Sequence, residues 1–489
     1  MRDDLGDVFT RDIDRIELPP PGVWLPTQTR VKRSRFGPLL AIPTVAGVIA
    51  LALAAAFVIQ LIRGDLPPQV AKSPSPAPSA GASAPASPAP PSASSSSAPT
   101  AIASSTPVTL PTSSAVHVSS TVPSGQWALI LQRNTTPGPG SGVLTSPMRD
   151  SIVAVSLGDG SFRPVLDFVS GAAGQNRVAS NLLREQFSSD GHRLVLSVFD
   201  GDAATARLML VIVDVVNGTV SRLTSDAAFD DEHPVWSPNG DQIAFSRRPA
   251  AQQAGASNPS GTIWVVRQDG TGLRQVLGPS AQRDDTTAVL GWNSDGSAIA
   301  YLRGFEGSPY YLVNVASGTV RNVSDHNTAF GTVADWRVGT PAFVGALMQG
   351  PYGSAAYLVT AGTDGSGSRD IVTDTTGHNS AFQGARWRPG SNDILYTRWE
   401  AGAGGSPTWN IFVTDSSGRA PRVIATRRDM TLLAAWTADG RDVVGLSATG
   451  VGGGLFLVAP DGTNERQIFS FGGAPESRTE WLQLAVLSL

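Results

Sequence analysis

Apolar and polar residues alternate in short stretches from about residue 123 onward, which is the period of half-buried β-strands. One of the clearest is WSPNGDQIAFSR (236–247), in which a tight turn separates an aromatic residue from an alternating run. Asn-Gly adopts the positive backbone angles of hairpin turns, and the proline before it cannot continue a strand ladder. The pattern predicts a β-hairpin.

Six copies of this hairpin follow one another along the chain. Each opens on an aromatic residue, and successive copies lie 44 to 56 residues apart: Phe187, Trp236, Trp292, Trp336, Trp387 and Trp436. Two further strands follow each copy, for example TIWVVRQDG (262–270) and LRQVLG (273–278), and seven copies of this second pair can be counted. Four antiparallel strands per unit of this length predict the blades of a β-propeller. The tryptophans are expected to pack as large apolar plates between neighbouring blades.

The first unit lacks its innermost strand. WALILQR (127–133) forms its second strand, and the last segment, TEWLQLAVLSL (479–489), places Trp481 where another aromatic strand is due. This segment can complete the first blade and close the ring, which removes exposed sheet edges. HVSST (117–121) is an alternative for the missing strand. Both assignments predict an all-β, seven-bladed propeller of four-stranded antiparallel blades.

The motif WSPNGDQIAF followed by IWVVRQDGTGLRQVL resembles the TolB-like, WD40-like β-propeller family. The resemblance covers residues 123–489. It is strong in the units that begin at Trp236, Trp292 and Trp436, and weak at Trp336, where VGTP replaces the usual turn. The resemblance implies a propeller that binds a partner. The same repeat occurs in periplasmic interaction proteins and in the accessory propeller of prolyl peptidases, so it does not identify the partner.

The N-terminal part has a different organisation. Residues 37–62 contain no charge, and about 20 apolar residues suffice to cross a bilayer, so a transmembrane helix is predicted there. Arg30, Lys32, Arg33 and Arg35 precede it and only Arg63 follows closely, which places residues 1–36 in the cytoplasm. Residues 63–122 are rich in Pro, Ser and Ala and predict a disordered linker. The expected product is a single-pass membrane protein with an extracytoplasmic propeller at residues 123–489.

Composition removes several kinds of chemistry. The chain has no cysteine, which excludes disulfides, a Cys nucleophile and thiolate metal sites. No lysine follows Lys72, and no G-x-S-x-G nucleophile motif is present. A net charge of -4 gives no indication of a nucleic-acid partner. These features predict no enzymatic activity, no catalytic residues and no cofactor.

Polar residues gather in the segments that lead into the innermost strands, where propellers commonly bind partners. The candidate residues of this rim are Asp231, Glu232, His233, Asp284, Asp285, Asp325, His326, His378, Arg428, Asp429 and Glu476. His233, His326 and His378 could converge on a metal ion or act in acid–base catalysis. The alternative is that turns are polar because they are hydrated, which predicts an ordinary interaction rim and no metal site.

The function expected from these patterns is recognition of a protein, peptide or envelope polymer by a membrane-tethered propeller. One alternative is a transmembrane signalling protein, because the short cytoplasmic tail before a single span loosely resembles bacterial anti-sigma factors. The other is a propeller-type lyase or hydrolase that uses the mouth of the channel.

Overall fold

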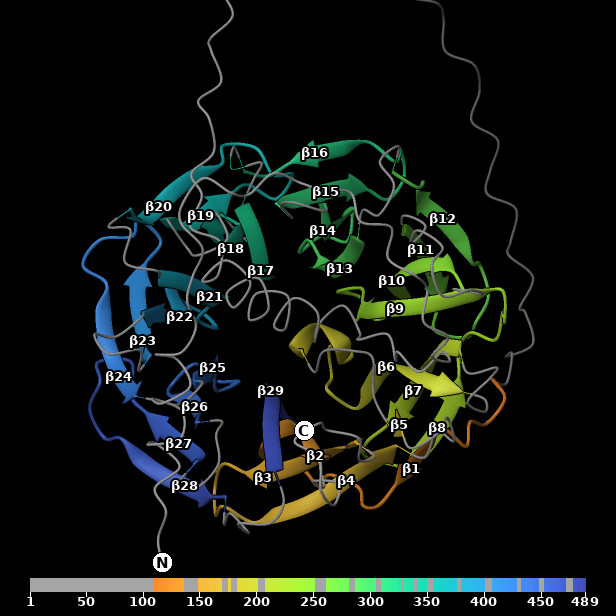
Figure 1. Cartoon of the computed structure of the whole chain (residues 1–489), viewed down its shortest axis with the longest axis horizontal. Coiled ribbons are helices and arrows are strands. Elements are labelled where there is room, and N and C mark those ends of the chain that lie inside the picture. Colours follow the sequence, from red (N-terminus) through yellow and green to blue (C-terminus); the bar gives the residue numbers. More distant parts are fainter. Residues whose placement is uncertain are drawn as a thin grey trace, which may run out of the picture. The chain divides into compact units, whose positions relative to one another are not determined.

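Seven sheets form a ring in the computed structural model of the chain (Figure 1), and we call the region that their innermost strands enclose the channel. The structure describes residues 110–489 except for 136–147, 169–174, 177–182, 201–206, 251–260, 281–285, 305–308, 325, 327–328, 338–340, 350–354, 376–379, 401–406, 429–431, 448–452 and 472–477. The prediction of a seven-bladed propeller with four-stranded antiparallel blades is confirmed.

Strands occupy four positions from the channel outward. The innermost are β9 (Phe229–Trp236), β13 (Thr286–Trp292), β17 (Ala329–Trp336), β21 (Ser380–Trp387), β25 (Leu432–Trp436) and β29 (Arg478–Ser488). The second are β2 (Gln126–Thr135), β6 (Arg193–Asp200), β10 (Gln242–Pro249), β14 (Ala298–Gly304), β18 (Phe343–Gln349), β22 (Asp393–Glu400) and β26 (Val443–Ser447). The third are β3 (Met148–Ser156), β7 (Arg207–Asp214), β11 (Thr262–Arg267), β15 (Tyr310–Asn314), β19 (Ala355–Ala361), β23 (Thr408–Asp415) and β27 (Gly454–Val458). The outermost are β4 (Phe162–Phe168), β8 (Thr219–Arg222), β12 (Arg274–Leu277), β16 (Val320–Asn322), β20 (Arg369–Asp374), β24 (Arg422–Arg428) and β28 (Arg466–Ser470). We number the blades 1 to 7 in the order of these outermost strands.

The C-terminal strand closes the ring. β29 is the innermost strand of blade 1 and pairs with β2 along almost its whole length. The segment proposed as an alternative, HVSST, does not fill this place, because β1 (Val116–Val118) pairs with β4 on the outer edge of the same blade. β1 also lies within the segment predicted to be linker. The short β5 (Gln175–Asn176) adds a parallel pairing to β3.

The matching of Trp481 to the repeated tryptophans is wrong. Trp481 pairs with Gln132, in the middle of the β2–β29 ladder. Leu487 pairs with Trp127 near the start of β2, as Trp236 pairs with Ile243 near the start of β10. Leu487 therefore holds the position that tryptophan holds in other blades, and its side chain is buried in a core shared by blades 1 and 2.

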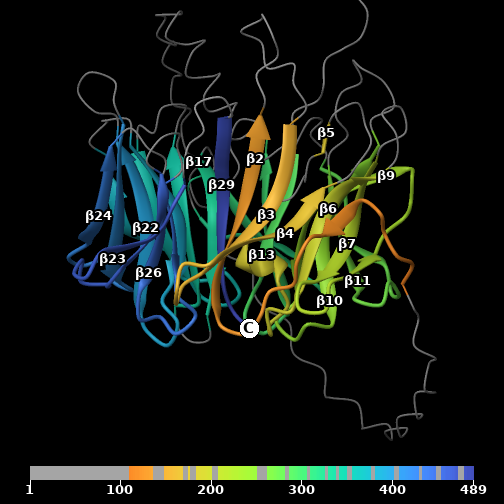
Figure 2. The same cartoon turned by 90° about the horizontal axis from the view of Figure 1, so that it is seen from below.

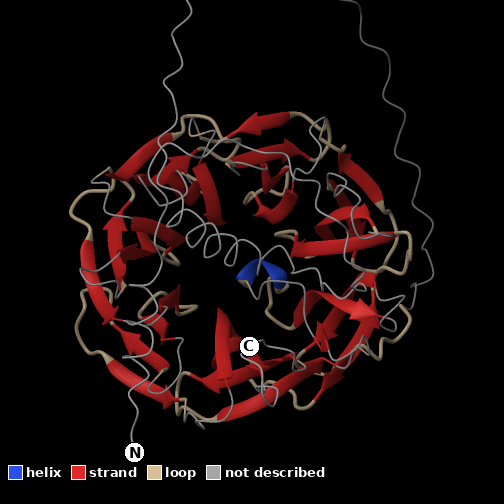
Figure 3. Cartoon of the chain, viewed as in Figure 1, coloured by secondary structure: helices blue, strands red, loops and turns tan. Residues whose placement is uncertain are grey.

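Blade 2 departs from the repeat at its innermost position. Its described residues form three strands, β6, β7 and β8, and Phe187 makes a single bridge to Leu194. In place of a regular strand stands a short 3-10 helix, η1 (Arg184–Gln186), which lies near the middle of the ring (Figure 3). The buried Gln186 side chain accepts a hydrogen bond from the Leu183 N–H and donates one to the Val195 carbonyl. These side-chain bonds fix η1 where ladder bonds would hold a strand.

The repeated tryptophans pack between blades, as their sequence position predicts. Trp387 lies in a cluster with Val344 of blade 5 and Ile394 of its own blade 6. Its indole Nε1 donates to the carbonyl of Ala342 at 2.9 Å. The Trp436 Nε1 likewise donates to the Arg386 carbonyl of the preceding blade at 3.3 Å. Trp387 and Trp436 therefore combine apolar burial with a hydrogen bond across the blade interface.

Five of the six innermost strands depart from regular pairing through a bulge or similar irregularity. In β21 it lies between Gln383 and Arg386 and includes Gly384 at φ +63°. The equivalent residue of β9, three positions before the tryptophan, is His233, which adopts φ +53°. Positive φ strains a residue that has a Cβ atom, whereas glycine tolerates it.

We expect His233→Ala to be less stable than His233→Gly by about 1 kcal/mol, because both remove the imidazole and only alanine keeps the strain. Gly384→Ala should cost a similar amount, since a Cβ there meets nothing within 4 Å and only the backbone suffers. Urea unfolding of the variants measures these differences. Equal stability of the two His233 variants would show that this backbone is not strained.

No helix among the residues that the structure describes is long and apolar enough to cross a membrane. The span predicted at 37–62 lies outside those residues, as do the cytoplasmic tail at 1–36 and most of the linker. These segments stay predictions.

Candidate functional site

Four of the five predicted rim residues that the structure describes are buried or paired: Asp231, Glu232, His233 and His326. Asp231 lies in β9, and its two carboxylate oxygens accept hydrogen bonds from Arg247 Nε at 2.6 Å and Nη2 at 2.8 Å. Both side chains are almost fully buried. The Arg247 guanidinium also lies over the rings of Phe229 and Trp264. Burial raises the pKa of Asp231, and its bonds to Arg247 oppose that rise. This pair stabilises blade 3 internally and offers little to a partner.

Glu232 and His233 are buried beside it. Glu232 accepts a hydrogen bond from Arg248 Nη2 at 3.1 Å. His233 is 8% exposed, and its Nδ1 has no hydrogen-bond partner among the described residues. Burial lowers the pKa of the imidazole. Sequence reasoning placed both residues in an exposed loop. The irregular pairing in β9 instead keeps this segment in the strand and turns its side chains into the blade.

The other two described rim residues, His326 and Arg428, belong to different blades. His326 Nε2 lies 3.0 Å from both carboxylate oxygens of Asp370 on β20, and its ring stacks on Tyr357 at 3.7 Å between centroids. Arg428 is exposed at the end of β24. The others lie outside the described residues: Asp284, Asp285, Asp325, His378, Asp429 and Glu476. Among the side chains that are described, no three of His, Asp or Glu gather closely enough to hold a metal ion.

A cavity of about 550 Å³ lies elsewhere, inside the central channel. It is found where the innermost strands end, next to the turns that contain Pro389 and Ala438. The C-terminus lies at this same end of the propeller (Figure 2). Except for the three residues in β9, the predicted rim residues precede the innermost strands in the sequence, whereas the cavity lies where these strands end.

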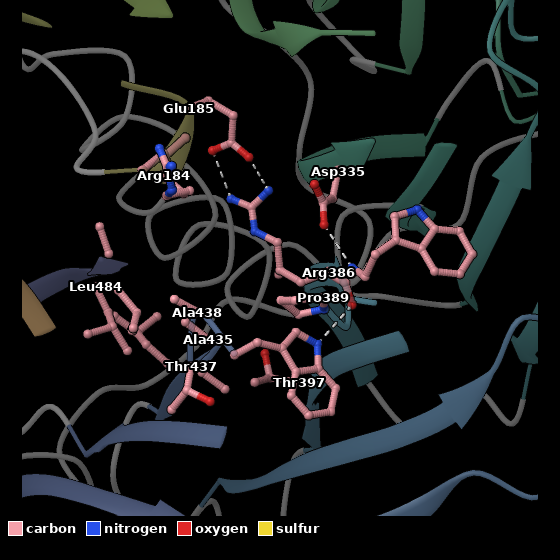
Figure 4. A pocket seen from close by; sticks show the side chains of 18 of the residues that line it. Arg184, Glu185, Asp335, Arg386, Pro389, Thr397, Ala435, Thr437, Ala438 and Leu484 are labelled. Carbon is pink, nitrogen blue, oxygen red and sulfur yellow. Dashed lines mark hydrogen bonds and ion pairs between the residues drawn. The ribbon is translucent and has the colours of Figure 1, made fainter. Parts of the chain in front are cut away.

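An ion pair crosses the channel at this cavity. Glu185 of η1 accepts two hydrogen bonds from Arg386 of β21, at 2.6 Å from Nη1 to Oε1 and 3.1 Å from Nη2 to Oε2 (Figure 4). The two residues are separated by 201 positions in the sequence and belong to blades 2 and 6. Their side chains are 18% and 16% exposed, so the pair is largely shielded from bulk water.

Asp335 of β17 supplies a second carboxylate. Its Oδ2 accepts a hydrogen bond from the Trp387 backbone N–H at 2.8 Å, and its Oδ1 accepts one from the Trp336 N–H at 2.8 Å. Burial raises the pKa of Asp335 to about 6, and the charge of Glu185 adds to this rise while Arg386 opposes it. A carboxyl group that titrates near neutral pH can exchange a proton with a bound molecule.

Arg184 adds a second positive charge to the side of the cavity that holds Glu185 and Arg386. Its guanidinium donates to the carbonyls of Phe187, Ser188 and Ser189, which hold it against its own turn. The other side of the cavity is apolar and includes Leu433, Ala435, Leu484 and Val486. The cavity therefore presents charged groups to one part of a ligand and hydrocarbon to another, which is the usual design of a small-molecule or peptide site.

Sequence reasoning missed these residues, although a signal was present. Four cavity residues hold the same position in the repeat. Each comes directly before the repeated tryptophan, or before the leucine that replaces it in β29: Asp335, Arg386, Ala435 and Val486. A charge at this position occurs only in ADW (334–336) and ARW (385–387) among the repeats. Those two exceptions could have marked blades 5 and 6. Glu185 could not have been found this way, because it belongs to a turn that breaks the repeat.

Comparison with known proteins finds no matching family model and no match among curated proteins. Solved structures with a similar fold include an oligogalacturonate lyase in complex with manganese (13% identity, 70% of this chain and 85% of that chain, TM-score 0.45). They also include a prolyl endopeptidase (10% identity, 72% and 50%, TM-score 0.48) and TolB from Acinetobacter baumannii (14% identity, 74% and 65%, TM-score 0.36). The chain thus spans half the length of that endopeptidase.

These likenesses concern the fold alone. The prediction that the chain is not an enzyme is nevertheless wrong as a conclusion from this fold, because the similar structures include lyases and peptidases beside TolB. The absence of a nucleophile motif does not exclude the acid–base chemistry that a group such as Asp335 can perform. What the blades themselves show is a seven-bladed β-propeller.

Proposed function

We propose that the protein is a membrane-tethered recognition protein whose propeller binds its ligand in the channel cavity. The observation that carries this proposal is the cavity itself: about 550 Å³, with the Glu185–Arg386 pair and Asp335 on one side and apolar side chains on the other. Pockets that bind small molecules or short peptides have volumes of roughly 300 to 1,000 Å³ and combine an apolar lining with a few polar groups.

The proposed position of the propeller outside the cell is supported by the sequence. The uncharged segment at 37–62 and the basic residues before it support an N-terminus in the cytoplasm and a propeller on the other side of the membrane. Protease added to intact cells, after removal of any outer layer, should therefore digest the propeller and leave residues 1–36 attached to the membrane. Protection of the propeller until the membrane is dissolved would contradict this placement.

The binding site is tested by filling the cavity. A library of short peptides and oligosaccharides is screened for compounds that raise the melting temperature, because a ligand that binds only the folded state stabilises it. Ala435→Trp, which places an indole in the cavity, should abolish the shift produced by every specific compound. Val423→Trp is the matched control, since Val423 lies on the outermost strand β24 and is 50% exposed. Shifts that survive in Ala435→Trp and disappear in Val423→Trp would move the site to the outer face.

A further inference from the structure

Glu185 lies against the Arg386 guanidinium in the cavity. It approaches Arg386 in a bidentate geometry, which is the arrangement that arginine also forms with free carboxylates. Both residues line the cavity, so a ligand that enters it meets this ion pair directly. The contact joins two blades through side chains alone and is part of no strand ladder.

The turn that carries Glu185 has its own anchors. Gln186 bonds to the Leu183 N–H and the Val195 carbonyl, and Phe187 is buried in the core of blades 1 and 2. The Glu185 side chain packs next to Gly291 of β13, since a Cβ atom added to Gly291 would lie 3.5 Å from the Glu185 Cγ. Because the bonds of Gln186 and the burial of Phe187 do not involve the Glu185 carboxylate, η1 keeps them when Glu185 leaves Arg386.

Arg386 would stay in place when Glu185 leaves. Its Nη1 also donates to the Ala334 carbonyl of blade 5 at 2.8 Å, and the irregular pairing of β21 next to it sets the direction of its side chain. The charge of Arg184 lies on the same side of the cavity and is held there by three carbonyls. A prepositioned guanidinium with a second positive charge nearby favours an anionic group.

We propose that Arg386 binds a carboxylate of the ligand and that Glu185 occupies this position in the free protein as a displaceable competitor. The apolar side of the cavity then holds the body of the ligand, so the ligand class is a short apolar peptide with a free C-terminal carboxylate. This inference rests on the proposed function, and it adds the chemical group that is recognised and the residue that competes with it. A competing internal group weakens the apparent affinity by the fraction of molecules in which it occupies the site.

The probes are acetyl-Ala-Ala-Leu with a free C-terminal carboxylate and the same peptide with a C-terminal amide, titrated calorimetrically against the full chain. Glu185→Ala should bind the acid at least 10-fold more tightly than the wild type and leave the affinity for the amide within about 3-fold, because a charged hydrogen-bonded contact is gained only by the acid. Glu185→Gln should give a smaller gain in the same direction. Arg386→Gln should reduce binding of the acid to the level of the amide.

Glu465→Gln is the matched control for Glu185→Gln. Glu465 pairs with Arg427 at the same distance, 2.6 Å, on the outside of the propeller, so its loss should leave both affinities unchanged. Equal gains for acid and amide in Glu185→Ala would overturn the carboxylate inference but leave cavity binding intact. No gain for the acid would overturn the role of Glu185 as competitor. Failure of both peptides to bind any variant would contradict the inference, while compounds found by the screen and lost in Ala435→Trp would still support the proposed function.

Discussion

Deleting residues 478–489 should abolish cooperative folding of the propeller. This segment is β29, the innermost strand of blade 1, and its Ala485 and Leu487 are only 1% exposed. Its side chains belong to two cores, since Leu487 packs between blades 1 and 2 while Val486 packs with strands of blade 7. Burial of each such aliphatic side chain contributes about 1.5–3 kcal/mol, and the deletion also exposes the edge of β2. The total approaches the whole stability of a typical domain.

A graded variant makes this expectation quantitative. Leu487→Ala should lower the free energy of unfolding by about 2–5 kcal/mol, because it removes a buried side chain and leaves a cavity between two blades. Val423→Ala, at a 50% exposed position, should change it by less than about 0.5 kcal/mol. Urea unfolding followed by circular dichroism measures both. A truncated chain that unfolds with the midpoint of the full chain would show that β29 does not close the ring.

Asp335→Asn should change how stability depends on pH. The folded-state pKa of Asp335 is raised to about 6 from the ordinary value of 3.8, so the folded protein holds this proton more tightly than the unfolded chain does. The stabilisation from this group is complete below about pH 4 and is lost as the pH rises through 6. A difference of about two pKa units corresponds to roughly 3 kcal/mol. The wild type should therefore lose up to about 3 kcal/mol relative to Asp335→Asn between pH 4 and pH 7.

Asp461 provides the control, because its pKa is shifted in the opposite direction from that of Asp335. The pKa of Asp461 is lowered by hydrogen bonds from Thr463, so its contribution is present at neutral pH and is lost as the pH falls. Relative to Asp461→Asn, the wild type should lose stability on acidification. Unfolding curves at pH 3, 4, 5, 6 and 7 compare the three proteins, because the Asp461 effect lies below its ordinary pKa of 3.8 and the Asp335 effect lies above that value. A constant difference between the wild type and Asp335→Asn over this range would mean that Asp335 titrates normally.

The fold could be predicted because its signals are local. The Asn-Gly turn at 239–240, the tryptophan before it and the alternating run after it all lie within one hairpin, and Trp236 indeed packs in the core formed by blades 2 and 3. The repeat also required a strand to close blade 1, and β29 fills that place. The repeat failed at Phe187, where the side chain of Gln186 supplies bonds that a ladder would otherwise make.

The site could not be predicted in the same way, because it depends on contacts between distant blades. Glu185 and Arg386 meet only after the ring closes, and neither residue belongs to a recognisable motif. The rim prediction relied instead on the polarity of residues such as Asp231, which turns inward to pair with Arg247. Polarity shows that a side chain needs a partner, and in β9 that partner is in the same sheet.

We expect a ligand to bind in the channel between Arg386 and the apolar residues near Leu484. A structure of the full chain in complex with the tightest compound from the screen tests it most directly. We expect the ligand inside the cavity, with its carboxylate on the Arg386 guanidinium and Glu185 displaced from it. A ligand bound on the outer strands or at the opposite end of the channel, with the Glu185–Arg386 pair intact, would contradict it.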